Sequence, residues 1–196
     1  ATVRVCTTVE NEAEAASDVV VRSSIVAPDG SVVGVSEALT TIEAGREHEL
    51  SHDLLVSSPK LWSPDTPQLY QMETQVIVGH EVVDTTTTPF GIRSLHFDAD
   101  VGFLLNGRSL KIKGGCVHHD DGVLGAASYD RAEERKVELL KDSGFNAIRC
   151  AHNPPAPAFL DACDRLGMLV IDEAFDCWRG GKNPCDYHVV FDDWWR

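Results

Sequence analysis

Apolar and polar residues alternate in short segments through the first part of the chain. Clear examples run from Val19 to Ile25 and from Tyr70 to Val78. Half-buried strands have this pattern because successive side chains point to opposite faces of a sheet. A Pro-Asp-Gly sequence ending at Gly30 lies between two such segments and predicts a tight turn, since glycine accepts a positive φ angle. Several short strands at regular spacing predict a β-sandwich over residues 1–88.

From residue 89 onward the pattern changes to alternating strands and helices. An Asn106-Gly107 pair predicts a hairpin turn between two apolar segments. A helix is predicted next, with Asp130 as its cap and Glu133 in a capping box, followed by a strand over Asn146–Cys150. A second helix is predicted to start at the cap Asn153, with Pro154 in its first turn, and to end at Gly167. An almost wholly apolar strand over Met168–Ile171 is predicted to follow it. This order predicts an α/β arrangement with parallel strands.

A complete β/α barrel needs about 250 residues, more than the 196 of the whole chain. We therefore expect residues 89–196 to form the N-terminal part of a truncated (β/α)8 TIM barrel, with about three of its eight units. An open barrel exposes strand edges and apolar faces. We therefore expect the open barrel edge either to self-associate or to pack against further sequence.

The composition narrows the classes of partner. The chain has 17 Lys and Arg against 31 Asp and Glu, a formal net charge of −14. Nucleic-acid binding is not expected, because it needs a basic patch and the basic residues do not cluster. No apolar run reaches the roughly 18 residues of a membrane span, and the first residues do not form a signal peptide. We expect a cytoplasmic protein that needs no cofactor and has no membrane partner.

Polar residues cluster at the predicted carboxyl ends of three successive strands. They are His118, His119 and Asp120 after the first, Arg149 and His152 after the second, and Asp172 and Glu173 after the third. Substrates of β/α barrels bind at this end of the strands. Three clusters at matching positions therefore indicate a binding site better than any single histidine does.

No complete pair of catalytic carboxylates is apparent. Two carboxyl groups about 5 Å apart can cleave a glycosidic bond when both face it. Asp172 and Glu173 are adjacent, so their side chains are expected on opposite faces of a strand. Glu133, Glu134 and Glu138 fall on a predicted helix and are expected to be solvated. The sequence thus supplies binding groups without a full catalytic set.

A metal site is the rival interpretation of the same residues. His118, His119, Asp120 and His152 are adequate zinc ligands in chemical type. Adjacent histidines on one strand would not bind one ion together, and the spacing is unspecific. We assign no metal ligands, and a metal-dependent TIM-barrel hydrolase stays an alternative.

The run from Asn146 through Ile171 resembles the signature of glycoside hydrolase family 2, the β-galactosidase and β-glucuronidase family. Three further segments are similar to that family: Leu61–Tyr70 to a motif of its immunoglobulin-like domain, Phe90–Arg93 to the link into its barrel, and Asp172–Trp178 to the end of its third barrel strand. The resemblance implies an immunoglobulin-like sandwich over residues 1–88.

The resemblance also implies roles for the polar residues. His118 and His152 would contact hydroxyls of the non-reducing sugar, and Arg149 would lie beside the nucleophile carboxylate. His119 and Asp120 would lie near the same rim. The family's acid/base and nucleophile glutamates would both follow Arg196, so no catalytic residue is expected within the chain.

The function expected from this resemblance is a fragment of a retaining exo-β-glycosidase, foremost a β-galactosidase, acting on a carbohydrate substrate. The isolated fragment is expected to be inactive because it lacks both glutamates. A non-catalytic carbohydrate-binding module is a further alternative, which the sandwich half alone favours.

Overall fold

The computed structural model of the chain describes residues 1–195. It divides into two compact units. The first comprises residues 1–62 and 68–93, and the second comprises residues 63–67 and the chain from residue 94 onward. The predicted fold class, an immunoglobulin-like sandwich followed by the start of a TIM barrel, is confirmed. The boundary between residues 88 and 89 stays a prediction.

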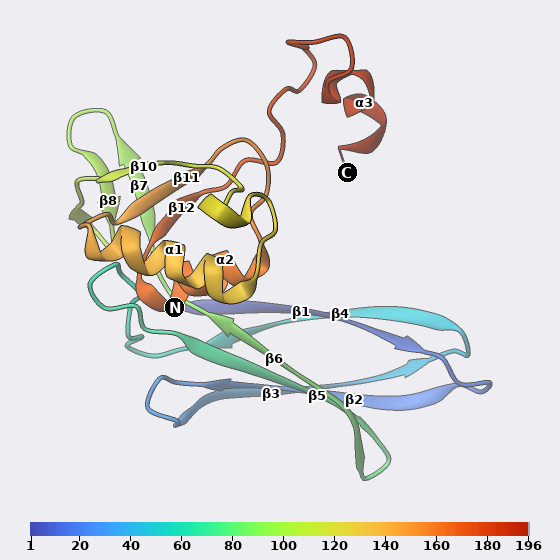
Figure 1. Cartoon of the computed structure of the whole chain (residues 1–196). Helices are drawn as coiled ribbons and strands as arrows, with labels where there is room; N and C mark the ends of the chain where they lie inside the picture. The colour runs from blue at the N-terminus through green and yellow to red at the C-terminus, as the bar shows by residue number, and fades with distance from the viewer. Residues whose placement is uncertain (196) are drawn as a thin grey trace. The chain divides into compact units, whose positions relative to one another are not determined.

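The first unit consists of two antiparallel sheets (Figure 1). One sheet pairs β1 (Thr2–Asn11) with β4 (Arg46–Leu55), and the other has the order β3-β2-β5-β6, made of β3 (Val32–Ile42), β2 (Ser17–Val26), β5 (Tyr70–Val78) and β6 (Glu81–Phe90). The alternating pattern did not predict β6, because nine of its ten residues are exposed and leave no apolar stripe.

Apolar side chains from both sheets meet in the core of the first unit. Val5 and Leu54 contribute from one sheet, and Ile25 and Met72 from the other. Trp62 lies in the proline-rich segment before β5 and is only 1% exposed. Its backbone N–H donates to the carbonyl oxygen of Ile92 at 2.8 Å. The segment thus leads the indole into the interior, where burial of a large aromatic side chain stabilises the fold.

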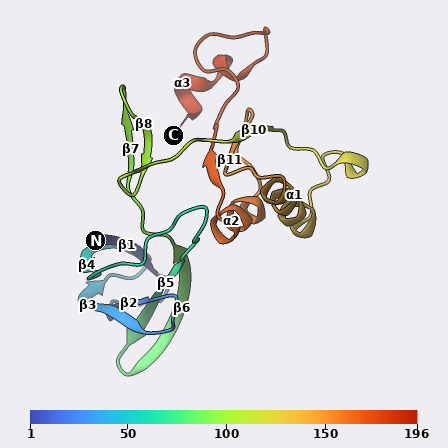
Figure 2. The same cartoon turned by 90° about the vertical axis from the view of Figure 1, so that its left-hand side faces the viewer.

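The second unit opens with a small antiparallel sheet of β7 (Leu95–Asp98), β8 (Gly102–Leu105) and β9 (Arg108–Ser109). A parallel sheet of β10 (Gly114–Val117), β11 (Ala147–Cys150) and β12 (Leu169–Ile171) follows, with α1 (Asp130–Asp142) and α2 (Pro157–Leu166) packed together over one face (Figure 2). The short elements are η1 (Gly122–Leu124), η2 (Tyr187–Val189) and α3 (Phe191–Trp194). Across residues 1–195, no helix combines the length and apolar character needed to cross a bilayer.

Both predicted helix starts are wrong. Tyr129 rather than Asp130 occupies the N-cap of α1, and Asp130 is already helical. The start of α2 lies at Pro157 rather than just after Asn153. A residue that precedes proline disfavours the helical region, and prolines at 154, 155 and 157 impose this restriction repeatedly. The helix can therefore begin only once the last of these prolines occupies its first position.

The two faces of β11 have opposite character. Ile148 and Cys150 pack against Val137 of α1 and Phe159 of α2, and all four side chains are buried. Burial raises the pKa of the Cys150 thiol to about 11. Because successive strand residues alternate, Arg149 between them points to the face that the helices do not cover.

Gly167, at the end of α2, lies directly against the segment at residues 63–67. It adopts the left-handed region with φ 78°, and its N–H donates to the carbonyl of Cys163. A Cβ atom here would collide with the carbonyl of Pro64. The Lys141 ammonium donates to the carbonyl oxygens of Pro64 at 2.7 Å and Gly167 at 2.8 Å. Glycine is therefore required here for both backbone conformation and space.

Gly167→Ala should destabilise the second unit by about 2–4 kcal/mol, through a strained φ angle and a backbone clash. Gly144→Ala is the matched control, because Gly144 also has a positive φ but an added Cβ meets nothing within 4 Å. The free energy of unfolding of this control variant should fall by only about 1 kcal/mol. Urea denaturation followed by circular dichroism at 222 nm reports on the helices. Equal losses in the two variants would contradict the close approach to Pro64.

Candidate active site

The parallel register brings three strand ends to one edge of the sheet. Cys116 of β10 lies opposite Arg149 of β11, and Arg149 lies opposite Ile171 of β12. These side chains share the face away from the helices, since their neighbours Val117, Ile148 and Val170 pack against the helical layer. The residues that follow each strand therefore leave the sheet close to one another.

Arg149, His152 and Glu173 form a hydrogen-bonded cluster at this edge. The Arg149 Nε atom donates to Glu173 Oε1 at 2.5 Å, and His152 Nδ1 lies 3.1 Å from Glu173 Oε2. The second Arg149 Nη atom is 3.4 Å from His152 Nδ1, and the first donates to the Cys116 sulfur at 3.3 Å. The His118 ring stands nearly edge-on to the His152 ring, with 6.0 Å between centroids.

The electrostatics of this cluster hold Glu173 ionised. Hydrogen bonds from Arg149, and then from His152, lower the pKa of the Glu173 carboxyl. The pKa of Arg149 is raised by its hydrogen bonds to Cys116 and Glu173. An opposite charge at hydrogen-bond distance favours the charged form of each partner. The guanidinium is thus fixed in position by a carboxylate that stays negative at neutral pH.

A second ion pair extends the cluster. Lys182 Nζ lies 2.6 Å from Asp176 Oδ1, and the same oxygen is 3.6 Å from His152 Nδ1. The hydrogen bond from Lys182 lowers the pKa of Asp176. His152 therefore lies between two carboxylates, each of which also bonds to a cationic side chain. This network ties the segment after β12 to the end of β11.

The cluster lines an open hollow of about 500 Å³. Its lining residues are Arg149, His152, Asp172, Glu173, Ala174, Phe175, Asp176, Trp178 and Lys182. This volume lies within the range of pockets that hold small molecules. Charged groups and aromatic rings together are suited to a ligand with both hydroxyl groups and apolar faces.

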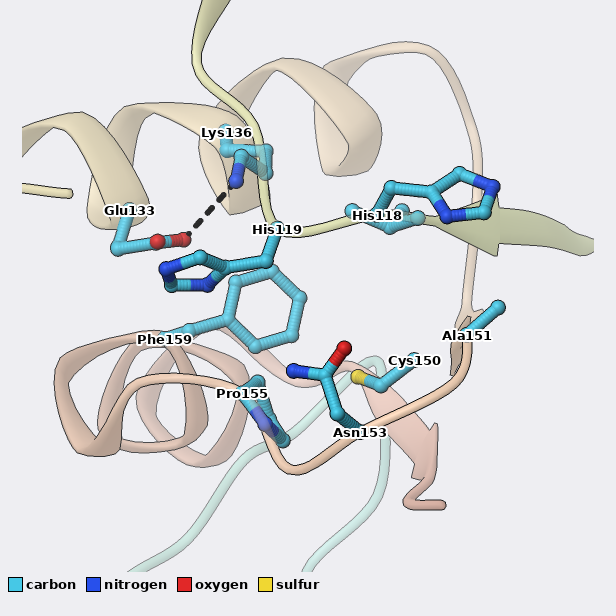
Figure 3. A pocket seen from close by; sticks show the side chains of 10 residues that line it. His118, His119, Glu133, Lys136, Cys150, Ala151, Asn153, Pro155 and Phe159 are labelled. Atoms are coloured by element: carbon cyan, nitrogen blue, oxygen red, sulfur yellow. Dashed lines mark hydrogen bonds and ion pairs between the residues drawn. The ribbon is translucent and has the colours of Figure 1, made fainter. Parts of the chain in front are cut away.

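His119 lies apart from this cluster. Figure 3 shows its ring directed toward Glu133, Lys136 and Phe159, while the His118 ring points away from them. His119 lines a cavity of about 20 Å³, which has room for a water molecule and none for a sugar ring. His118 lines the same small cavity, but its ring is directed away from that of His119.

Glu133 is buried, which corrects the expectation that it is solvated. Its side chain is 3% exposed, accepts a hydrogen bond from the Ser128 hydroxyl and pairs with Lys136 at 3.1 Å. Lys136 also pairs with Asp121 at 3.1 Å. Although burial alone would lower it, the pKa of Lys136 is raised by hydrogen bonds to Asp121 and Glu133. Ion pairs and hydrogen bonds of this kind offset the free-energy cost of burying a charged side chain.

In the described part of the chain, the side chains of Asp172 and Asp120, the remaining predicted site residues, make no hydrogen bond to the cluster of Arg149, His152 and Glu173. Asp172 lines the same hollow as Arg149 and Glu173, whereas Asp120 lines a different depression beside α1. The Asp120 N–H donates to the carbonyl of His118 at 2.9 Å. Within residues 1–195, no three His, Cys, Asp or Glu side chains come together in a way that could hold a metal ion.

Asp176, Trp178 and Lys182 line the hollow but were not predicted as site residues. They follow β12 in a segment without periodicity, so the strand-end criterion reaches only Asp172 and Glu173. The signal that could have found them is composition, since charged and aromatic residues are concentrated between positions 172 and 182.

Comparisons with known proteins cover both units of the chain. A family model described as glycosyl hydrolases family 2 matches residues 1–93. A second, described as the TIM barrel domain of the same family, matches residues 99–181. The two models together cover the sandwich, β10 to β12 and residues 172–181 after β12.

Individual relatives are similar over almost the full chain. The β-galactosidase BoGH2A of Bacteroides ovatus is 47% identical over 194 residues, which is 99% of this chain and 23% of the relative. A solved glycosyl hydrolase family 2 member from Bacteroides cellulosilyticus has a TM-score of 0.90 at 48% identity, covering 99% of this chain and 25% of that one.

A β-glucuronidase is also similar in structure. The solved Bacteroides uniformis β-glucuronidase has a TM-score of 0.86 at 31% identity, covering 93% of this chain and 22% of that one. The chain therefore spans about a quarter of the length of the relatives that it matches.

Titration of the Glu173 carboxyl group should test its pairing with Arg149 and His152. The pKa of Glu173 should lie below the usual glutamate value, so its pairing stabilises the fold at neutral pH and is lost as pH falls through that lowered pKa. Arg149→Gln should raise the Glu173 pKa, and His152→Gln should raise it less. Asp172→Asn is the control and should leave it nearly unchanged. NMR of the side-chain carboxyl carbon measures each pKa, and an unaltered value in Arg149→Gln would rule out the ion pair.

Proposed function

The chain belongs to glycosyl hydrolases family 2, and we propose on this basis that it contributes the immunoglobulin-like domain and first three barrel strands of a retaining exo-β-glycosidase. The single observation that carries the proposal is the cluster of Arg149, His152 and Glu173, with His118 beside it, at the carboxyl ends of parallel strands. Barrel enzymes bind and transform their substrates at that end.

The proposed reaction is hydrolysis by double displacement. One carboxylate attacks the anomeric carbon and displaces the leaving group, which a second carboxylic acid protonates. Water then cleaves the glycosyl–enzyme bond. We assign neither role to Glu173, because its two oxygens already bond to Arg149 and His152. In the proposed enzyme both roles belong to glutamates outside these 196 residues.

Within this reaction His118 and His152 would hold the hydroxyl groups of the terminal sugar. An imidazole can donate or accept a hydrogen bond, so it can bind a hydroxyl in either sense. Arg149 would lie beside the nucleophile and keep it ionised by its positive charge. Asp172 lines the same hollow and would support the rim of the site, whereas His119 and Asp120 line other depressions.

The proposed substrate is a β-galactoside. Carboxylates outnumber cations by three to two among the residues that line the hollow. Both cations already have carboxylate partners, Arg149 with Glu173 at 2.5 Å and Lys182 with Asp176 at 2.6 Å. A glucuronide would bring a further negative charge, whereas a galactoside is neutral.

Three further expectations stay predictions: a cytoplasmic location, self-association through the open barrel edge, and the absence of a nucleic-acid partner. The net charge of −14 supports the last of these.

The 196-residue chain alone should not hydrolyse p-nitrophenyl β-galactoside, because neither proposed catalytic glutamate lies within it. The matched sample is a polypeptide that continues this chain through a complete eight-stranded barrel, which should release p-nitrophenol under the same conditions. Absorbance at 400 nm measures both. Turnover by the 196-residue chain would overturn the assignment of the catalytic groups.

The extended polypeptide should prefer p-nitrophenyl β-galactoside over the glucuronide by at least about 10-fold in kcat/KM, or about 1.4 kcal/mol. Asp176→Asn removes the carboxylate partner of Lys182, so it should lower the ratio of kcat/KM for the galactoside to kcat/KM for the glucuronide. Asp192→Asn breaks an ion pair with Arg179, neither of which lines the hollow, and should leave the ratio unchanged. A higher kcat/KM for the glucuronide in the unaltered protein is the outcome against the galactoside assignment.

A further inference from the structure

Trp178 is a large apolar side chain exposed beside a charged cluster. The residue is 62% exposed, and it lines the hollow that also contains Arg149, His152 and Glu173. Because it lines the hollow beside charged groups, the indole offers a ligand there an apolar face next to polar partners.

The indole is held in orientation from one side. Its ring stacks on Phe191 with 5.9 Å between centroids and 20° between planes. Phe191 is itself stacked with Trp195 at 6.4 Å and contacts Phe175 edge-on at 5.7 Å. Arg179 lies over the Phe191 ring at 5.9 Å. This aromatic support fixes the plane of Trp178 and leaves much of its surface accessible.

The segment that carries Trp178 is also fixed to the sugar-binding residues. Glu173, five positions before it, bonds to Arg149 and His152. Asp176, two positions before it, lies 3.6 Å from His152 and bonds to Lys182. These bonds tie the segment that carries the indole to His152, as a binding surface for a two-part ligand requires.

The position of Trp178 along the chain indicates which part of a ligand it meets. Arg149 is the next-to-last residue of β11, and Glu173 comes two residues after β12, whereas Trp178 comes seven residues after β12. Groups near the strand ends hold the reacting part of a substrate, and the loops surround the rest. Trp178 thus belongs to the outer part of the hollow.

We propose that Trp178 is the stacking platform for the leaving group of the glycoside, an aromatic aglycone or the apolar face of a second sugar. This inference rests on the function proposed above, since it assumes that His118 and His152 hold the terminal sugar. An indole face offers apolar contact to either ligand without selecting hydroxyl positions. The platform therefore makes the site tolerant of many leaving groups while favouring flat ones.

The test is an NMR titration of the 196-residue chain with p-nitrophenyl β-galactoside and, separately, methyl β-galactoside. The indole N–H signal of Trp178 and the imidazole signals of His118 and His152 are followed together. Both ligands should shift the imidazole signals, and only the p-nitrophenyl ligand should shift the Trp178 signal strongly. The p-nitrophenyl ligand should bind about 2- to 10-fold more tightly. Trp194, which is 78% exposed but does not line the hollow, provides an internal control signal that should not move.

Two variants separate stacking from a change of fold. Trp178→Ala should remove the difference in affinity between the two ligands, and Trp178→Phe should keep part of it. Trp194→Ala should preserve the full difference. Shifts of the imidazoles without a shift of Trp178, or an affinity difference that survives in Trp178→Ala, would overturn the platform alone. A shift of Trp178 without any imidazole shift would support the platform and contradict the proposed sugar subsite. No shift of either kind would overturn both.

Discussion

The parallel pairing of β10, β11 and β12 is the constraint on which the site depends. Parallel strands end at the same edge, and the register sets Cys116, Arg149 and Ile171 side by side. A shift of β11 by one residue would turn Arg149 toward the helices and Ile148 toward the hollow. The burial of Ile148 and Cys150 under α1 and α2 opposes that shift, so packing on one face fixes the chemistry on the other.

Charge balance is the second feature that organises the site. Arg149 with Glu173 and Lys182 with Asp176 form two adjoining pairs, and His152 contacts a carboxylate of each. A further pairing, of Lys136 with Asp121 and Glu133, lies under His119 on the helical side. The first group faces the hollow, whereas the second is buried and holds the segment after β10 against α1. His118 and His119 are adjacent in the sequence, but their rings therefore lie in different environments.

Much of the fold follows from the sequence because the relevant signals are local. Strand alternation predicts the sandwich, the Asn106-Gly107 pair predicts a hairpin in which both residues have positive φ angles, and Gly167 ends its helix as expected. The helix starts were missed because successive prolines override a good capping residue at Asn153. Strand β6 was missed because it is exposed along almost its whole length.

The site could be predicted only in part for a related reason. Strand ends identify Arg149, His152 and Glu173, whose positions follow from register. The burial of Glu133 depends on Ser128 and Lys136 meeting it in three dimensions, and Trp178 is placed by ring contacts with Phe191. Such contacts have no period in the sequence.

The measurement that bears most directly on the site is a crystal structure of a polypeptide that continues this chain through a complete barrel, with a β-galactoside bound. The arrangement described here predicts sugar hydroxyls within hydrogen-bond distance of both His118 and His152, with Arg149 beside the carboxylate that faces the anomeric carbon. A sugar bound elsewhere, with the two imidazoles making no contact to it, would contradict the assignment of these strand ends as the substrate site.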